Sequence, residues 1–210
     1  MQSQIDPDVL DPKLVAFIRL KIDVSATHMY APGVRRHIAT AIELGATREE
    51  LLEVIKISAV IGIHACATGV PILAQELVHA GRQSGPREAT TPTPVIDGLL
   101  ERGQFNPLWE TLHNWDPDWL EAFLAMGAGI WSDHVLPPLW IELLCIAGDA
   151  ALTHMYEPGT RRHIAAALEL GASREQIDAV LRIVADQGRE CYEFALPILE
   201  HELSGIAAHR

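Results

Sequence analysis

Hydrophobic positions recur at helical spacing along much of the chain, and they predict a set of three helices that occurs twice. Over residues 32–44, at about 100° per residue, the apolar side chains share one broad face and the charged Arg36 falls opposite. A broad apolar face is typical of a helix that packs against a core. The first set is predicted to comprise helices over 12–29, from Pro32 or Gly33 to Leu44, and from Thr47 to a kink or break at Pro71.

Start signals for the third helix support this assignment. Thr47 followed by Glu50 has the pattern of a capping box, in which each side chain bonds a backbone N–H group of the other residue. Ser173 and Gln176 repeat the pattern in the second set. A tryptophan-rich segment ahead of the second set predicts one additional helix, over about 116–131.

The chain contains an internal duplication with an offset of 126 residues, from 27 to 153. The stretch THMYAPGVRRHI (27–38) returns as THMYEPGTRRHI (153–164), and VPILAQEL (70–77) returns as LPILEHEL (196–203). Two copies are too few for a solenoid, so we expect an internal pseudo-twofold, as in a symmetric dimer written in one chain. We predict a first repeat at 1–80, a linker rich in Gly, Pro, Ser and Thr at 81–105, and a second repeat at 106–210.

Composition and charge exclude several classes of protein. Of the 210 residues 49% are hydrophobic, which is ample for a core, and the formal net charge of −12 leaves no basic face for nucleic acid. No run reaches the roughly 18–20 apolar residues of a membrane span, and the N-terminus lacks the apolar region of a signal peptide, which favours a cytoplasmic protein. The three cysteines form no C-x-x-C pair, so we expect reduced, mostly buried thiols.

The repeated segment carries the candidate chemistry. On the second helix His37 lies on the apolar face, with Arg35 at its far edge. Arginines near a helix start oppose the positive end of the helix dipole, so we expect an anion nearby. It would be Asp23, its counterpart Asp149, a carboxylate of another subunit or an acidic ligand. The same field would keep His37 neutral and fit to act as a base.

Two further histidines belong to the first copy. His28 approaches the cavity of His37 if the turn between them reverses the chain, and His64 lies on a helix that is apolar nearly all round. Glu190 stands at the position of His64 in the second copy, whose third helix is more polar, so we expect two chemically different cavities. The candidates are, for proton transfer, His37, His163, His28, His154, Tyr30 and Tyr156 and, for substrate binding, Arg35, Arg161 and His64.

The stretches HIATAIELGATREEL (37–51) and HIAAALELGASREQI (163–177), with IGIHACATGVPI (61–72), resemble the carboxymuconolactone decarboxylase and alkylhydroperoxidase D-like family. The resemblance implies an all-α fold of two tandem repeats, a homo-oligomer that is a trimer of tandem chains, and general acid/base roles for the histidines that open the first two stretches. The peroxidase branch has a C-x-x-C pair just before the family histidine. The window at 30–36 has no cysteine, which argues against thiol peroxidase activity.

Three functions remain open at this point. The first is a decarboxylase-like lyase without a cofactor, acting on a small acidic or lactone-type substrate. In it Arg35 would hold a carboxylate and Tyr30 would donate to an enolate oxygen, while His37 or His28 would move a proton. The second is a metal enzyme with imidazole ligands from His28, His37 and His64 and with Asp23 bound to the metal or to one of its ligands. In the second copy Glu190 would replace the third imidazole, which gives two histidines and one carboxylate. The third is a non-enzymatic oligomeric or partner-binding module, in which the same side chains only stabilise the core and the subunit contacts.

Overall fold

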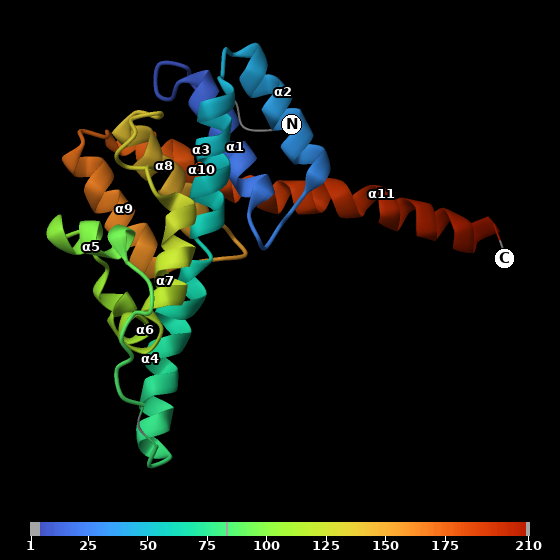
Figure 1. Ribbon diagram of the computed structural model, residues 1–210. Helices are drawn as coiled ribbons and strands as arrows, with labels where there is room; N and C mark the ends of the chain where they lie inside the picture. The colour runs from blue at the N-terminus through green and yellow to red at the C-terminus, as the bar shows by residue number, and fades with distance from the viewer. Residues whose placement is uncertain (1–4, 83, 209–210) are drawn as a thin grey trace. The chain divides into compact units, whose positions relative to one another are not determined.

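The computed structural model describes residues 5–82 and 84–208, and every regular element within those residues is helical. The predicted all-α class is therefore confirmed. The chain divides into two compact units (Figure 1), of which the first combines the residues up to Thr47 with those from Pro138 onwards and the second spans Arg48–Pro137. The predicted repeat boundaries follow sequence similarity rather than compactness, and they stay a prediction.

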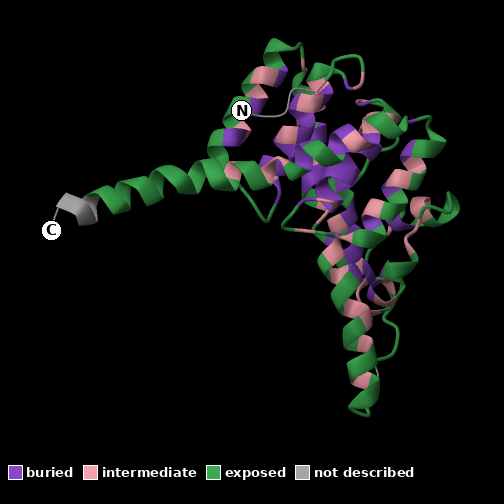
Figure 2. Cartoon of the chain, turned by 180° about the vertical axis from the view of Figure 1, so that it is seen from behind, coloured by how far each residue is buried: buried purple, intermediate pink, exposed green. Residues whose placement is uncertain are grey.

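The first unit is built around two helices that occupy equivalent places in the two copies. Its helices are α1 (Pro12–Val24), α2 (Ala31–Glu43), α8 (Pro138–Asp149), α9 (Glu157–Glu169), α10 (Arg174–Ala185) and α11 (Gln187–Ala208). α1 packs against α2, α8 and α10, and α8 packs against α9 and α10. Phe17 and Ile18 of α1 and Leu143 and Leu144 of α8 are fully buried in this core, which Figure 2 colours purple. Each such side chain stabilises the fold by about 1.5–3 kcal/mol.

Equivalent residues of the two copies meet in this unit. The hydroxyl oxygens of Thr27 and Thr153, one offset apart in the sequence, lie 2.6 Å from each other. A twofold axis produces this kind of contact between a residue and its own counterpart. The predicted pseudo-twofold between the helix pairs α1–α2 and α8–α9 would produce such a contact. The tandem arrangement of two complete repeats stays a prediction, since the third helix of the first copy belongs to the other compact unit.

The turn after α1 ends this helix earlier than the sequence predicted. Met29 takes a left-handed backbone with φ 46°, and the N–H group of Tyr30 donates to the carbonyl oxygen of Asp23 at 2.8 Å. A left-handed methionine costs about 1 kcal/mol or more and persists only where surrounding contacts hold it. Met155 repeats the conformation with φ 49°, so both copies close the same turn.

The second unit departs from the predicted helix limits. Its helical segments are α3 (Arg48–Val60), α4 (Ile63–His79), α5 (Pro94–Glu101), η1 (Pro107–Trp109), α6 (Glu110–Trp115), α7 (Pro117–Leu124) and η2 (Ala125–Gly127). The predicted break at Pro71 is wrong, because that residue lies inside α4 and the chain breaks at Gly62 instead. The helix expected over 116–131 is also shorter, since Gly129 takes a φ of 90° beyond η2. The predicted linker contains a helix, α5.

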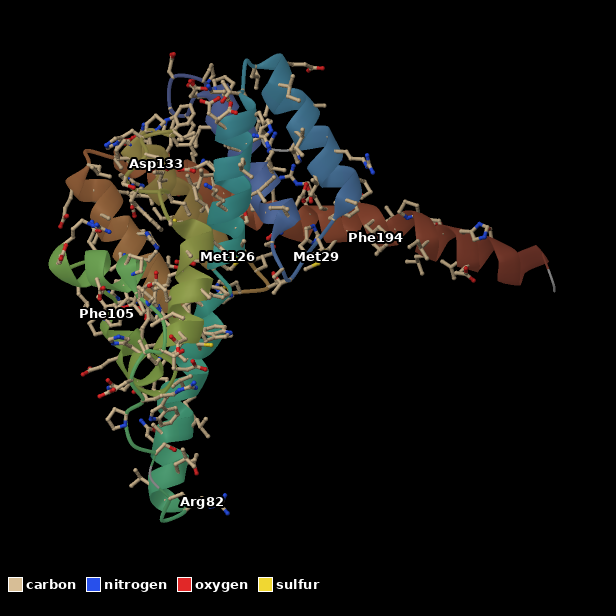
Figure 3. All side chains as sticks on the ribbon, viewed as in Figure 1. Met29, Arg82, Phe105, Met126, Asp133 and Phe194 are labelled. Atoms are coloured by element: carbon tan, nitrogen blue, oxygen red, sulfur yellow. The ribbon has the colours of Figure 1, made fainter. Side chains whose placement is uncertain are left out.

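Two apolar segments stand out for their exposure. Arg48–His79 is long and apolar enough to cross a membrane by length and composition alone, although the sequence analysis expected no such segment. The same composition suits a helix that packs against another protein chain. In the first unit, α11 is exposed at every residue from Cys191 to Ser204 (Figure 2), and Phe194, labelled in Figure 3, is 70% exposed.

Candidate functional site

Each copy brings one buried histidine against one buried aspartate. Asp23 and His37 are 3% and 5% exposed, and Asp149 and His163 are 1% and 8% exposed. The aspartate lies near the C-terminal end of α1 or α8, and the histidine lies on the helix that follows. This approach requires glycine at the start of that helix, because a Cβ at Gly159, or at its counterpart in the first copy, would overlap the aspartate carboxylate.

In the first copy two imidazoles share the carboxylate of Asp23. Its Oδ2 lies 3.4 Å from His37 Nε2, and its Oδ1 lies 3.4 Å from His28 Nε2. The turn between the helices therefore reverses the chain as the sequence suggested, and both histidines reach one place. His28 is one-third exposed, so this cluster connects the buried carboxylate to the surface.

The arginines take different places from those predicted. The helical wheel put Arg36 opposite the apolar face, and Arg36 is exposed there, yet its Nη2 lies 3.4 Å from His37 Nε2. The long arginine side chain spans the angle between neighbouring helical positions, which a wheel of Cα directions does not represent. Arg35 is exposed. Arg161 is also exposed, and its Nε donates to Glu157 Oε1 at 2.7 Å in a surface ion pair.

A small hollow opens beside the first pair, with a free volume of about 20 Å³. This is room for one or two water-sized groups. Its polar lining consists of Arg19, Asp23, His37, Asp186, Gln187 and Glu190. Asp186, Gln187 and Glu190 come from the second copy, at the end of α10 and the start of α11. These two helices of the second copy therefore complete the hollow of the first. Glu190, which the sequence analysis assigned to the second cavity, therefore belongs to the first.

Burial sets the protonation of the first pair. It lowers the pKa of His37 to about 4, with the positive charges of Arg36 and Arg19 acting in the same direction. Burial also raises the pKa of Asp23 to about 6, with Glu190 adding to the rise. His37 is thus neutral at pH 7, as predicted, but the cause is burial beside two guanidinium groups rather than the helix dipole alone.

The second copy holds its histidine between two carboxylates. His163 Nδ1 lies 2.6 Å from Glu142 Oε2, and both side chains are about nine-tenths buried. A carboxylate can only accept, so Nδ1 carries the hydrogen and donates it. His163 Nε2 lies 3.8 Å from Asp149 Oδ2, and His154 Nε2 lies 4.0 Å from Asp149 Oδ1. The imidazole therefore presents Nε2 toward Asp149.

A buried amine and a buried thiol lie close to the second pair. Burial raises the pKa of Asp149 to about 6, opposed by the charges of His163 and Lys21. Lys21 is fully buried, its Nζ has no hydrogen-bond partner among the described residues, and burial lowers its pKa. Burial also raises the pKa of the Cys145 thiol. A protonated thiol is a poor nucleophile, which again argues against peroxidase chemistry at this position.

The remaining candidate residues divide between the two units. The Tyr156 ring stacks on His154 with centroids 5.6 Å apart, and Tyr30 lies 5.5 Å from His28 in a tilted arrangement. Both tyrosines thus flank the outer histidine of their own copy. His64 lies on α4 in the second compact unit and is partly buried.

Four charged residues of the site escaped the sequence analysis. Glu142 is the sole acid in the middle of the apolar helix α8, and a buried carboxylate needs a polar partner, so its position alone was a usable signal. Arg19 and Lys21 interrupt α1 in the same way. Asp186 gave no such signal, since it is the C-cap residue of α10, and polar residues are common at helix ends.

The chain is of the all-helical class, and each of two related helix pairs buries one imidazole and one carboxylate. Comparisons with known proteins identify the family. The carboxymuconolactone decarboxylase family model matches residues 117–196. A solved structure from Burkholderia xenovorans LB400, provisionally assigned as a gamma-carboxymuconolactone decarboxylase subunit, is 40% identical. It covers 94% of this chain, which in turn covers 80% of that protein, with a TM-score of 0.81. No curated protein sequence matches significantly.

The chain therefore belongs to the carboxymuconolactone decarboxylase family. The matched region contains Glu142, Asp149, His154 and His163, which together make up the second site.

Proposed function

We propose that the chain is a cytoplasmic decarboxylase-like lyase that acts on a small carboxylated, lactone-type substrate by acid/base chemistry, with no organic cofactor. The observation that carries the proposal is the buried hydrogen bond of 2.6 Å between Glu142 and His163. Glu142 fixes the orientation of the ring and stabilises the imidazolium form, so that Nε2 can deliver a proton. The name of the related Burkholderia protein points to the same reaction class.

In the proposed reaction the bond between the carboxylate carbon and the substrate carbon breaks, and CO₂ leaves. The electron pair of that bond passes through a conjugated double bond to the lactone carbonyl oxygen, which becomes an enolate. His163 Nε2–H then protonates the substrate carbon as the carbonyl re-forms, and water returns a proton to the imidazole. A positioned acid of this kind contributes a rate factor of about 10²–10⁴.

Two neighbours fit the remaining tasks of the second site. The positive charge of Arg162 lowers the pKa of both Asp149 and Tyr156, which supports a role for Arg162 at this site, whereas Arg161 is engaged by Glu157 on the surface. We therefore assign the carboxylate-binding role to Arg162. The partly buried hydroxyl of Tyr156 would donate to the enolate oxygen, where a fixed donor stabilises developing charge.

The test is turnover of gamma-carboxymuconolactone, followed as CO₂ release. The variant His163→Gln is expected to lower kcat at least about 100-fold, because no proton donor remains. Glu142 acts as a positioning residue, so Glu142→Gln should lower kcat with little change in KM and shift the pH profile, while Glu142→Asp should recover part of the rate. The exposed His201→Gln is the matched control and should retain full activity.

Two results would count against the proposal. Unchanged turnover in His163→Gln would remove the histidine from the reaction. A wild-type chain that is folded and assembled, yet releases no CO₂ from any carboxylated lactone, would leave the non-enzymatic module as the better function.

We also propose that the chain assembles as a homo-oligomer, a trimer of tandem chains as the family resemblance implies. Support comes from the exposed apolar side chains of α11, where Tyr192, Leu199 and Leu203 are 65%, 53% and 53% exposed. Soluble proteins seldom leave a contiguous apolar stripe of this kind in water.

A further inference from the structure

The first copy gathers three side chains with metal-ligating atoms outside the proposed catalytic pair of the second copy. Asp23, His28 and Glu190 each offer one ligand atom, and these atoms all lie within 4.8 Å of one another. They come from the end of α1, the turn that follows it and the start of α11. We propose that this cluster is a binding site for a divalent first-row transition metal ion, with Zn²⁺ as its representative.

A second, independent observation points to a cation at this place. Asp23 Oδ2 is buried, it has no hydrogen-bond partner among the described residues, and Asp23 as a whole is only 3% exposed. The carboxylate borders the hollow that Glu190 also lines. A buried carboxylate oxygen without a hydrogen bond is unfavourable, and a coordinated cation removes the deficit.

The donor set selects the class of ion. One imidazole and two carboxylates are ligands that Zn²⁺, Mn²⁺ and Fe²⁺ accept, and none of the three residues is a soft thiolate. His37 Nε2, 3.4 Å from Asp23 Oδ2, is near enough to add a second imidazole or to orient the carboxylate. The hollow beside the cluster leaves space for water or for one oxygen of a substrate.

The charges around the cluster are compatible with a bound cation. Arg19 and Arg36 face it and would weaken metal binding through repulsion. Three carboxylates, those of Asp23, Asp186 and Glu190, oppose these two guanidinium groups. Arg36 is exposed, so its side chain can turn toward solvent when a cation enters.

This site differs from the one predicted from the sequence. The sequence suggested His28, His37 and His64 as ligands, with Asp23 as a further ligand or a neighbour of one, and the cluster has Glu190 in place of His64. Because Glu190 corresponds to His64 across the offset, the two copies carry different donors at this position. The proposal thus assigns different chemistry to the two copies, with a metal in the first and proton transfer in the second.

The experiment uses the full-length chain without an affinity tag, freed of metal by a chelator and titrated with Zn²⁺ alone in a calorimeter. One equivalent should bind. Glu190→Gln and His28→Ala should each weaken binding at least about tenfold. Glu202→Gln, the same change at an exposed position of the same helix, should leave the affinity unchanged. Thermal melting of each variant establishes that it is folded. If Glu190→Gln does not fold, Glu190→Asp, which keeps the charge, takes its place in the titration.

Cobalt absorption gives a readout of the ligands themselves. The Co²⁺-loaded wild-type chain should show d–d bands of nitrogen and oxygen ligation without a thiolate charge-transfer band. A thiolate band would overturn the proposal, because it would place the ion at a cysteine. The absence of saturable Zn²⁺ binding, or binding that neither Glu190→Gln nor His28→Ala weakens, would overturn it as well.

Discussion

At the scale of single residues, the two aspartates carry a free-energy cost that serves the site. Asp149 is 1% exposed, and burial is the largest cause of its raised pKa of about 6. A protein optimised only for stability would place an amide or an apolar side chain here. A functional role explains the presence of Asp149: its carboxylate would exchange a proton with His163. Groups with a strongly shifted pKa are concentrated in functional sites.

The stability lost by burying Asp149 can be measured through the pH dependence of the free energy of unfolding. The folded chain keeps the proton up to about pH 6, whereas the unfolded chain releases it near the ordinary value of 3.8. Folded protein therefore binds more protons between these values, and the free energy of unfolding falls as pH rises from about 4 to 6. Asp149→Asn has no carboxyl group to titrate at this position. As pH rises from 4 to 7, its free energy of unfolding should therefore increase by about 1–3 kcal/mol relative to that of the wild type.

Urea denaturation of both proteins at several pH values gives this difference directly. Asp178→Asn, at a partly exposed carboxylate on α10, is the matched control for the loss of one negative charge. A difference between Asp149→Asn and wild type that stays constant from pH 4 to pH 7 would show that this carboxyl does not titrate as the structure indicates.

At the scale of elements, the close contact between α8 and α9 depends on a glycine. A Cβ at Gly159 would overlap Asp149 Oδ2, so the carboxylate or the helix would have to move. We expect Gly159→Ala to destabilise the chain by about 1–3 kcal/mol, the range for overpacking, and to lower any activity that depends on His163. Gly188→Ala, within α11 and with open space around the new methyl group, should instead be neutral or stabilise by up to about 1 kcal/mol. Chemical denaturation of the two variants tests the difference, and equal stability of the two would contradict it.

Helix starts were predictable from the sequence, and helix ends much less so. The capping box of Ser173 and Gln176 is formed, because its signal is local and needs only the residues of one turn. α1 ends where Ser25 leaves the helical conformation, and the turn that follows contains a left-handed Met29, which no propensity indicates. The break at Gly62 accompanies packing against the Phe123 ring, where a Cβ would lie 3.3 Å from Cζ. Contacts outside the helix itself determine where such a helix ends. The local sequence therefore could not predict these helix ends.

At the scale of the whole molecule, the duplication predicted the paired histidines and their aspartates, and it could not predict how the copies differ. The pairs recur because the offset preserves the aspartate, the THMY stretch of the turn (27–30 and 153–156), the glycine and the buried histidine. The partners that distinguish them are Glu142, which lies on α8 where the first copy has Ala16, and Glu190, which α11 brings to the first pair. Since Glu190 contributes to the hollow of the other copy, the assignment of side chains to sites required the packing of α11, which follows from the fold and not from the repeat.

The same helix supplies the last prediction, which concerns assembly. Tyr192, Leu196, Leu199 and Leu203 follow one another at spacings of four, three and four residues, and all are exposed on α11. This spacing places them along one stripe, as in helices that pack against a partner helix. We expect light scattering to give a mass about three times the 23.1 kDa of one chain.

Charged residues in the apolar stripe of α11 should dissociate the oligomer without unfolding the first unit. The double variant Leu199→Glu/Leu203→Glu would place two carboxylates in the contact, where burial of unpaired charge is costly, and its mass should fall toward that of one chain. Glu200→Gln, which lies between these positions off the stripe, should keep the wild-type mass. A wild-type chain that already has the mass of a monomer at all concentrations would remove the stripe as a subunit contact, and with it the proposed trimer.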